Sequence, residues 1–138
     1  MHILNSYLRS EDAVLSRKLT EVAILVAAWE FQQQYEWTHH EPAARQFGVS
    51  EAVIDTIKYD REVENLPREE TLIINYARQV LREHKLNSEL WSEAVELFGQ
   101  QGAYEIAAIV GDYIMAAVML DATDQRLPEG EEKLLPAR

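Results

Sequence analysis

The stretch RKLTEVAILVAAWEFQQQYEWTHHEPAARQFGVSEAVIDTI, residues 17–57, decides the fold class. Apolar residues recur in its first part at the spacing of one helix face, which predicts a helix over about 16–31. A second helix is expected over about 35–47, because the glycine that follows it favours a C-terminal stop. Ser50 suits the N-cap of a short third helix over about 51–59. The stretch therefore predicts three consecutive helices.

The helical pattern continues towards the C-terminus. A helix is expected over about 68–84, with Pro67 near its first turn, where a missing backbone donor costs nothing. Two more are expected over about 88–99, with Ser88 as candidate cap, and over about 103–122. No alternating run between turn signals indicates a sheet. The sequence predicts an all-α fold of about six helices.

The length of 138 residues suits one domain, spanning residues 1–138. We expect its core to cover about 14–124, the part with helical apolar spacing. The tail over 125–138 is polar and contains proline, so it is expected to be extended.

Composition excludes several classes of protein. The 13 Lys and Arg residues against 24 Asp and Glu residues give a net charge of −11, which disfavours nucleic acid and membrane surfaces as partners. The chain has no cysteine, so disulfides, thiolate metal sites and cysteine nucleophiles are excluded. The N-terminus lacks the charged start and apolar run of a signal peptide, so we expect a cytoplasmic protein.

The segment AYEIAAIVGDYIMAAVML, residues 103–120, is apolar on nearly every side. Glu105 and Asp112 interrupt it, which favours a buried core helix over a membrane span. A domain of this size has difficulty burying such a helix all round. We therefore expect a homo-oligomer.

The candidate chemistry lies in YEWTHHEP, residues 35–42. Glu36 and His40 are four residues apart, so a helix places the carboxylate and the imidazole on one face. A carboxylate beside a histidine favours the protonated ring, which is the equipment of a general acid or base near neutral pH. His39 lies on a different face, about 100° around the helix.

Two other interpretations of this spacing stay open. Glu/His pairs at this separation also occur as solvated surface pairs. A metal site could use Glu36 and His40 with Glu21 or His39, although no familiar ligand spacing is matched, and we expect neither a metal nor a cofactor.

Residues 17–57 resemble the carboxymuconolactone decarboxylase family, which includes the alkylhydroperoxidase D-like proteins. The resemblance lies in Glu36-Trp37-x-x-His40-x-x-x-Ala44-x-x-x-Gly48 and the short helix after it. Two later helical stretches and the tail RLPEGEEKLLP are also similar, so the resemblance covers about 14–136. It implies an alkylhydroperoxidase D-like helical domain that assembles as a trimer or hexamer.

The alkylhydroperoxidase branch uses a glutamate, a Cys-x-x-Cys pair and a histidine four residues after the second cysteine. The matching positions here are Glu21, Gln33, Glu36 and His40, so both thiols are missing. Peroxide reduction through a thiolate and a resolving thiol needs those cysteines. The resemblance leaves a peroxidase or peroxiredoxin-type protein as an alternative, but one whose thiol mechanism this chain cannot perform.

The decarboxylase branch resembles this sequence more closely, with a glutamate four residues before the histidine and no cysteine pair. It implies a carboxy-lyase without a cofactor, acting on a small carboxylated lactone or a related acid. In that reading His40 is the general acid or base, Glu36 orients it and Glu21 supports it. A non-catalytic helical oligomer that keeps the fold is a further alternative.

Substrate-binding residues are expected around this pair. Tyr35 and Trp37 would wall the pocket and lower its dielectric constant, and Gln33 would line it. Asp112 and Tyr113 interrupt the most apolar helix, and we expect them to form a second wall of the pocket that faces His40. The alternatives are that they form an oligomer contact, or that Asp112 forms a buried ion pair with an arginine such as Arg17. Arg17 and Arg45 are the candidates for holding a substrate carboxylate.

Overall fold

The computed structural model describes residues 2–137, apart from the side chains of residues 2 and 3. The first and last residues of the predicted domain, Met1 and Arg138, lie outside that range. Within it the chain is all-helical, with six helices and no strand: α1 (His2–Leu8), α2 (Arg17–Glu30), α3 (Gln34–Gln46), α4 (Glu51–Lys58), α5 (Arg68–Glu83) and α6 (Ser88–Ala122). The predicted all-α class is confirmed.

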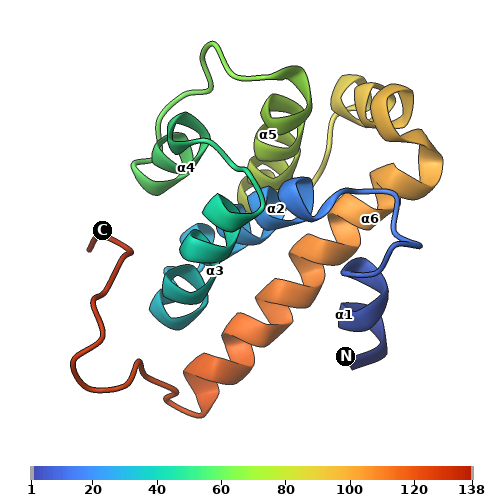
Figure 1. The fold of residues 1–138 in the computed structure, drawn as a ribbon. Coiled ribbons are helices and arrows are strands. Elements are labelled where there is room, and N and C mark those ends of the chain that lie inside the picture. The colour runs from blue at the N-terminus through green and yellow to red at the C-terminus, as the bar shows by residue number, and fades with distance from the viewer. Residues whose placement is uncertain (1, 138) are drawn as a thin grey trace.

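Helix α2 is the centre of the core. It contacts α3, α4, α5 and α6, and every residue from Leu19 to Trp29 is buried. A helix that is apolar on all sides must be covered on all sides, which explains why the other long helices gather around it. In Figure 1, α3 and the long α6 pass in front of α2, while α4 and α5 lie above it.

The prediction lacked α1 and separated a helix over 88–99 from one over 103–122. In the structure α6 runs from Ser88 to Ala122 but consists of two helical parts that meet at a kink, at the predicted end of the first. Its backbone breaks at Gly99, with φ 73° and ψ 173°, a conformation open to glycine and strained for other residues. Figure 1 shows the resulting bend near the start of α6. The N-cap is Asn87, whose side chain accepts from the Leu90 amide, and not Ser88.

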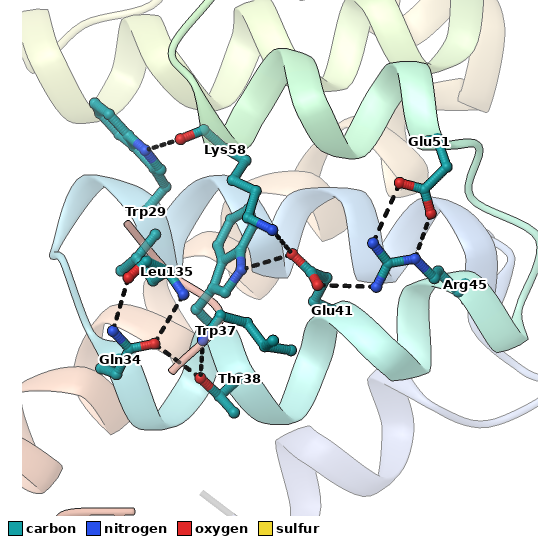
Figure 2. A network of polar contacts seen from close by, with 10 residues as sticks. Trp29, Gln34, Trp37, Thr38, Glu41, Arg45, Glu51, Lys58 and Leu135 are labelled. Carbon is teal, nitrogen blue, oxygen red and sulfur yellow. Dashed lines mark hydrogen bonds and ion pairs between the residues drawn. The ribbon is translucent and has the colours of Figure 1, made fainter. Parts of the chain in front are cut away.

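After α6 the C-terminal tail turns back and runs upward on the side of α3, at the left of Figure 1. The side-chain amide of Gln34 donates to the Leu135 carbonyl and accepts from the Leu135 amide, both at 2.8 Å, in the manner of a paired strand (Figure 2). The Leu134 amide donates to Thr38 Oγ1 at 3.2 Å, and the Leu135 side chain is buried. The tail contains no helix over residues 125–137, and it is attached to α3.

Helix α6 is long and apolar enough to cross a membrane by length and composition alone. A core helix meets the same two criteria, and 44% of its most apolar window is buried within this domain. Glu105 and Asp112 both lie on its buried face.

Candidate active site

The tight turn between α2 and α3 determines which side chains meet. The Gln33 amide donates to the Ala28 carbonyl at 2.9 Å, and Gln32 adopts a positive φ of 49°. The Gln33 side chain then caps α3 by accepting from the amides of Tyr35 and Glu36. This reversal lays α3 back along α2, so side chains of the two helices face each other.

His40 lies between two carboxylates from different helices. Its Nδ1 is 2.8 Å from Oε2 of Glu21 on α2, and its Nε2 is 3.4 Å from Oε2 of Glu36 on α3. The Glu21 side chain is 1% exposed, the Glu36 side chain 11% and the His40 side chain 13%. Glu21 is therefore the closer and more deeply buried partner, although sequence spacing had given that role to Glu36.

The two carboxylates control the charge of the imidazole. Burial by itself lowers the pKa of His40, because it disfavours the charged ring. Hydrogen bonds and charge attraction from Glu21 and Glu36 outweigh burial and raise the pKa of His40 to about 8. At neutral pH the ring is consequently a buried cation with two acceptors, able to give up a proton.

Helix α6 supplies the opposite wall. The Tyr113 ring meets the His40 ring edge-on, with centroids 5.2 Å apart and an interplanar angle of 89°. The neighbouring Asp112 is buried, and burial raises its pKa against the opposing charge of Arg9. Of the predicted pair Asp112 and Tyr113, Tyr113 is thus in ring contact with the histidine.

Helix α1 and the loop after it cover this wall through polar contacts. Arg9 donates to the Tyr113 hydroxyl, and the Asn5 amide, oriented with its NH₂ towards α6, donates to Asp112. Tyr7 donates to Glu105 at 2.7 Å, and the same carboxylate accepts from the backbone amide of Val14. Figure 1 shows α1 beside the middle of α6. The N-terminal segment is therefore attached to α6 next to the histidine.

Three of the predicted substrate-binding residues lie elsewhere. Trp37 is fully buried on another face of α3, where its Nε1 donates to Glu41, so it is not in position to wall the histidine. The Gln33 side chain already has partners, because its oxygen caps α3 and its nitrogen donates to Asp121 at 2.6 Å. The Tyr35 ring contacts that of exposed His39 at a tilt of 46°, with centroids 4.4 Å apart. The 100° step between successive helical residues explains why neighbours of Glu36 and His40 point away from them.

Tyr35 and Gln33 instead line a cavity of about 510 Å³ between the start of α3, the end of α6 and the tail. Its other polar groups include Asp121, Arg126 and Lys133, and it contains no histidine. The His40 cluster is the stronger candidate for a reactive site, because a buried histidine with a raised pKa between two carboxylates is a better indicator of chemistry than volume alone.

The two predicted carboxylate-binding arginines are both paired with carboxylates of the protein. Arg17 contacts Glu21 at 3.3 Å and lies over the Phe47 ring. Arg45 is held by Glu41 at 2.8 Å and by Glu51, as Figure 2 shows. Arg45 therefore belongs to a separate structural network on α3 and α4.

That network compensates a buried acid. Glu41 is 2% exposed and binds Lys58 at 2.8 Å, Arg45 at 2.8 Å and the Trp37 indole at 3.1 Å. Burial by itself raises the pKa of Glu41, and these three donors lower it below its ordinary value. Three donors on one carboxylate explain how an acid is tolerated in the core.

Arg9 is the site residue that the sequence did not indicate. Leu4 and Leu8 have the spacing of a helix face, but the run is short, and Arg9 reaches Tyr113 across 104 positions of the chain. No local spacing rule connects such residues.

Among the residues described, no group of three or more His, Asp or Glu side chains is arranged to hold a metal ion. No protein-family model, curated protein or solved structure matches the chain. The resemblance to the carboxymuconolactone decarboxylase family therefore stays a prediction.

Proposed function

We propose that this protein is a cofactor-free enzyme that decarboxylates a small carboxylated lactone or a related acid by general acid catalysis from His40. The observation that supports the proposal most is the position of the imidazole between the carboxylates of Glu21 and Glu36, at 2.8 Å and 3.4 Å. The fold that we propose for it is the alkylhydroperoxidase D-like helical domain.

The chemistry requires a proton donor at neutral pH. When a carboxylate leaves as carbon dioxide, its bonding electron pair moves into the unsaturated lactone, and a proton must then be added to carbon. His40, with a pKa raised to about 8, is mostly protonated at pH 7 and can supply it. The net reaction consumes one proton per carbon dioxide released, which solvent returns to the ring.

The two nitrogens of the ring suit different tasks. Nδ1 faces Glu21, the deeper carboxylate, which holds the ring in place much as a buried acid orients a catalytic histidine. Nε2 faces Glu36, whose contact is longer and whose side chain is more exposed. We therefore assign proton delivery to Nε2, with Tyr113 as the neighbouring wall.

The test is a measurement of carbon dioxide release from carboxymuconolactone and a panel of related lactones and β-keto acids. Wild type should release carbon dioxide from at least one compound, and His40→Ala should lose at least about a hundredfold in rate, the usual contribution of a general acid. His39→Ala is the matched control, because His39 is adjacent but exposed and contacts Tyr35 instead. Equal rates for wild type and His40→Ala on every substrate found would contradict the proposal.

We further propose that the protein is a cytoplasmic homo-oligomer whose copies meet through α6. Tyr104, Met115, Val118 and Met119 on this helix are 42–60% exposed. Copies with a net charge of −11 repel each other, so they meet most easily over a face that adds no further like-charge contacts. These four side chains are uncharged. Glu105 and Asp112, on the buried face of α6, make insertion into lipid costly.

A further inference from the structure

Arg9 differs from the other arginines near the active site in what it binds. Its guanidinium donates to the Tyr113 hydroxyl, a neutral group, and its charge lies near the carboxylates of Glu21 and Asp112 without contacting either as an ion pair among the residues described. Arg17 is bound to the carboxylate of Glu21, as already described. In a chain with 24 acidic residues, an arginine with a phenol as its hydrogen-bond partner is conspicuous.

The position of Arg9 places it next to the reacting ring. Tyr113 contacts Arg9 through its hydroxyl, while the ring of the same side chain meets the edge of His40 at 5.2 Å between centroids. One tyrosine therefore separates the guanidinium from the imidazole. The Arg9 Cζ atom lies 5.8 Å from the Tyr113 ring centroid, so the cation lies close to the whole phenol.

We propose that Arg9 binds the carboxylate of the substrate, which replaces Tyr113 as the partner of the guanidinium. This inference rests on the proposed function and adds to it the residue that recognises the substrate. A guanidinium holds a carboxylate through two parallel charge-assisted hydrogen bonds, and these are stronger than its single bond to a phenol. Exchange of partners is therefore favourable when a carboxylate arrives.

The cover over the site stays in place during this exchange. Helix α1 is held to α6 by two other hydrogen bonds, from Tyr7 to Glu105 and from Asn5 to Asp112. It therefore stays attached when Arg9 changes partner. Asp112 and Glu36 lie close enough for their charges to interact. Both repel a substrate carboxylate that approaches them, which favours the binding orientation that places this carboxylate at Arg9.

The experiment measures binding and needs no turnover. The probes are the saturated γ-butyrolactone γ-carboxylate, which lacks the unsaturation that drives carbon dioxide loss, and its neutral methyl ester. Each is titrated into the full-length wild-type protein by calorimetry and by NMR of the His40 ring protons, which His40→Gln identifies. We expect the carboxylate to bind and to shift the His40 signals, and the ester to bind at least about tenfold more weakly.

The variants separate binding from attachment of α1. Arg9→Gln should weaken carboxylate binding at least about tenfold, and Arg9→Lys should fall between it and wild type. Tyr113→Phe removes the competing partner, so it should bind the carboxylate at least as tightly as wild type. Arg68→Gln, which removes an exposed arginine paired with Glu93 and Glu96, is the control for general charge.

Several results would overturn the inference. They are undetectable binding of the carboxylate to wild type, equal binding by wild type and Arg9→Gln, or equal losses in Arg9→Gln and Arg68→Gln. A loss in Tyr113→Phe that matches the loss in Arg9→Gln would show that the pair only holds α1. If Arg9→Gln does not fold, as judged by circular dichroism, Arg9→Lys and Tyr113→Phe decide the matter by the same criteria. Failure of His40→Ala to affect turnover, in contrast, would remove the proposed function and leave the binding result standing.

Discussion

At the scale of single residues, the chemistry of the site depends on where buried charge is placed. Glu21 is almost completely buried and has two partners, Arg17 and His40, which together compensate its charge. Glu36 is less buried and contacts the other nitrogen of the imidazole ring. An imidazole between two such groups keeps its proton at a pH where a free histidine would have lost it.

This arrangement makes stability depend on pH. The pKa of His40 rises from 6.5 to about 8 on folding, so the protonated ring stabilises the fold fully below about pH 6.5. The contribution, about 2 kcal/mol for a shift of that size, is lost as the pH rises through about 8. We expect the difference in free energy of unfolding between wild type and His40→Gln to shrink by about that amount between roughly pH 6 and pH 9.

Urea unfolding of both proteins across this pH range measures the difference. The control is His39→Gln, because His39 is exposed and its ring contacts Tyr35 instead of a carboxylate. A constant gap between wild type and His40→Gln at every pH would show that the carboxylates do not hold the proton.

At the scale of elements, local sequence signals predicted what lies within one helix and failed where distant segments meet. The apolar repeat predicted α2 to within a residue at each end, and the Glu36–His40 spacing predicted their contact. The contact of His40 with Glu21 depends on the turn between α2 and α3. Neither the positive φ of Gln32 nor the capping side chain of Gln33 has a strong sequence signature. The docking of α1 depends on partners about 100 residues away, which no periodic pattern encodes.

The bend in α6 yields a matched pair of glycine variants. Gly99 has φ 73° and ψ 173°, so Gly99→Ala should reduce the free energy of unfolding by about 1–3 kcal/mol. Gly111 lies in a regular part of the same helix, with nothing within 4 Å of an added Cβ, so Gly111→Ala should be neutral or stabilise by about 0.5–1 kcal/mol. Thermal unfolding of the two variants measures the contrast, and equal effects would argue against the bend.

The C-terminal tail is held to α3 mainly by one side chain. Gln34→Ala removes both hydrogen bonds to the Leu135 backbone, each worth about 1 kcal/mol. We expect hydrogen exchange at the Leu135 amide to become roughly ten to a hundred times faster. Gln46→Ala, at the exposed far end of α3, is the control and should leave this amide unchanged. An unaltered exchange rate in Gln34→Ala would mean that burial of Leu135 alone holds the tail.

At the scale of the whole molecule, the buried face and the exposed face of α6 make different contacts. Its buried face carries Glu105, Asp112 and Tyr113, which attach α1 and wall the histidine. Its exposed face carries large apolar side chains that a single copy leaves in water. Such a face is typical of a surface that another copy covers.

A charge placed on this face tests the proposed assembly. Met119 is 54% exposed, so Met119→Glu should leave the fold of one copy intact while it adds repulsion between copies. We expect sedimentation velocity to show an oligomer for wild type and a smaller species for Met119→Glu. Gln125→Glu, in the exposed tail, adds the same charge elsewhere and should behave as wild type. A monomeric wild type would contradict the assembly.

The most direct test of the central claim, that two carboxylates keep His40 protonated at neutral pH, is an NMR titration of the His40 ring in the wild-type protein. The measurement requires no substrate. We predict a midpoint of about 8 for His40 and a lower midpoint in Glu21→Gln, which loses the partner at 2.8 Å. A wild-type midpoint at or below 6.5, unchanged in Glu21→Gln, would contradict the account.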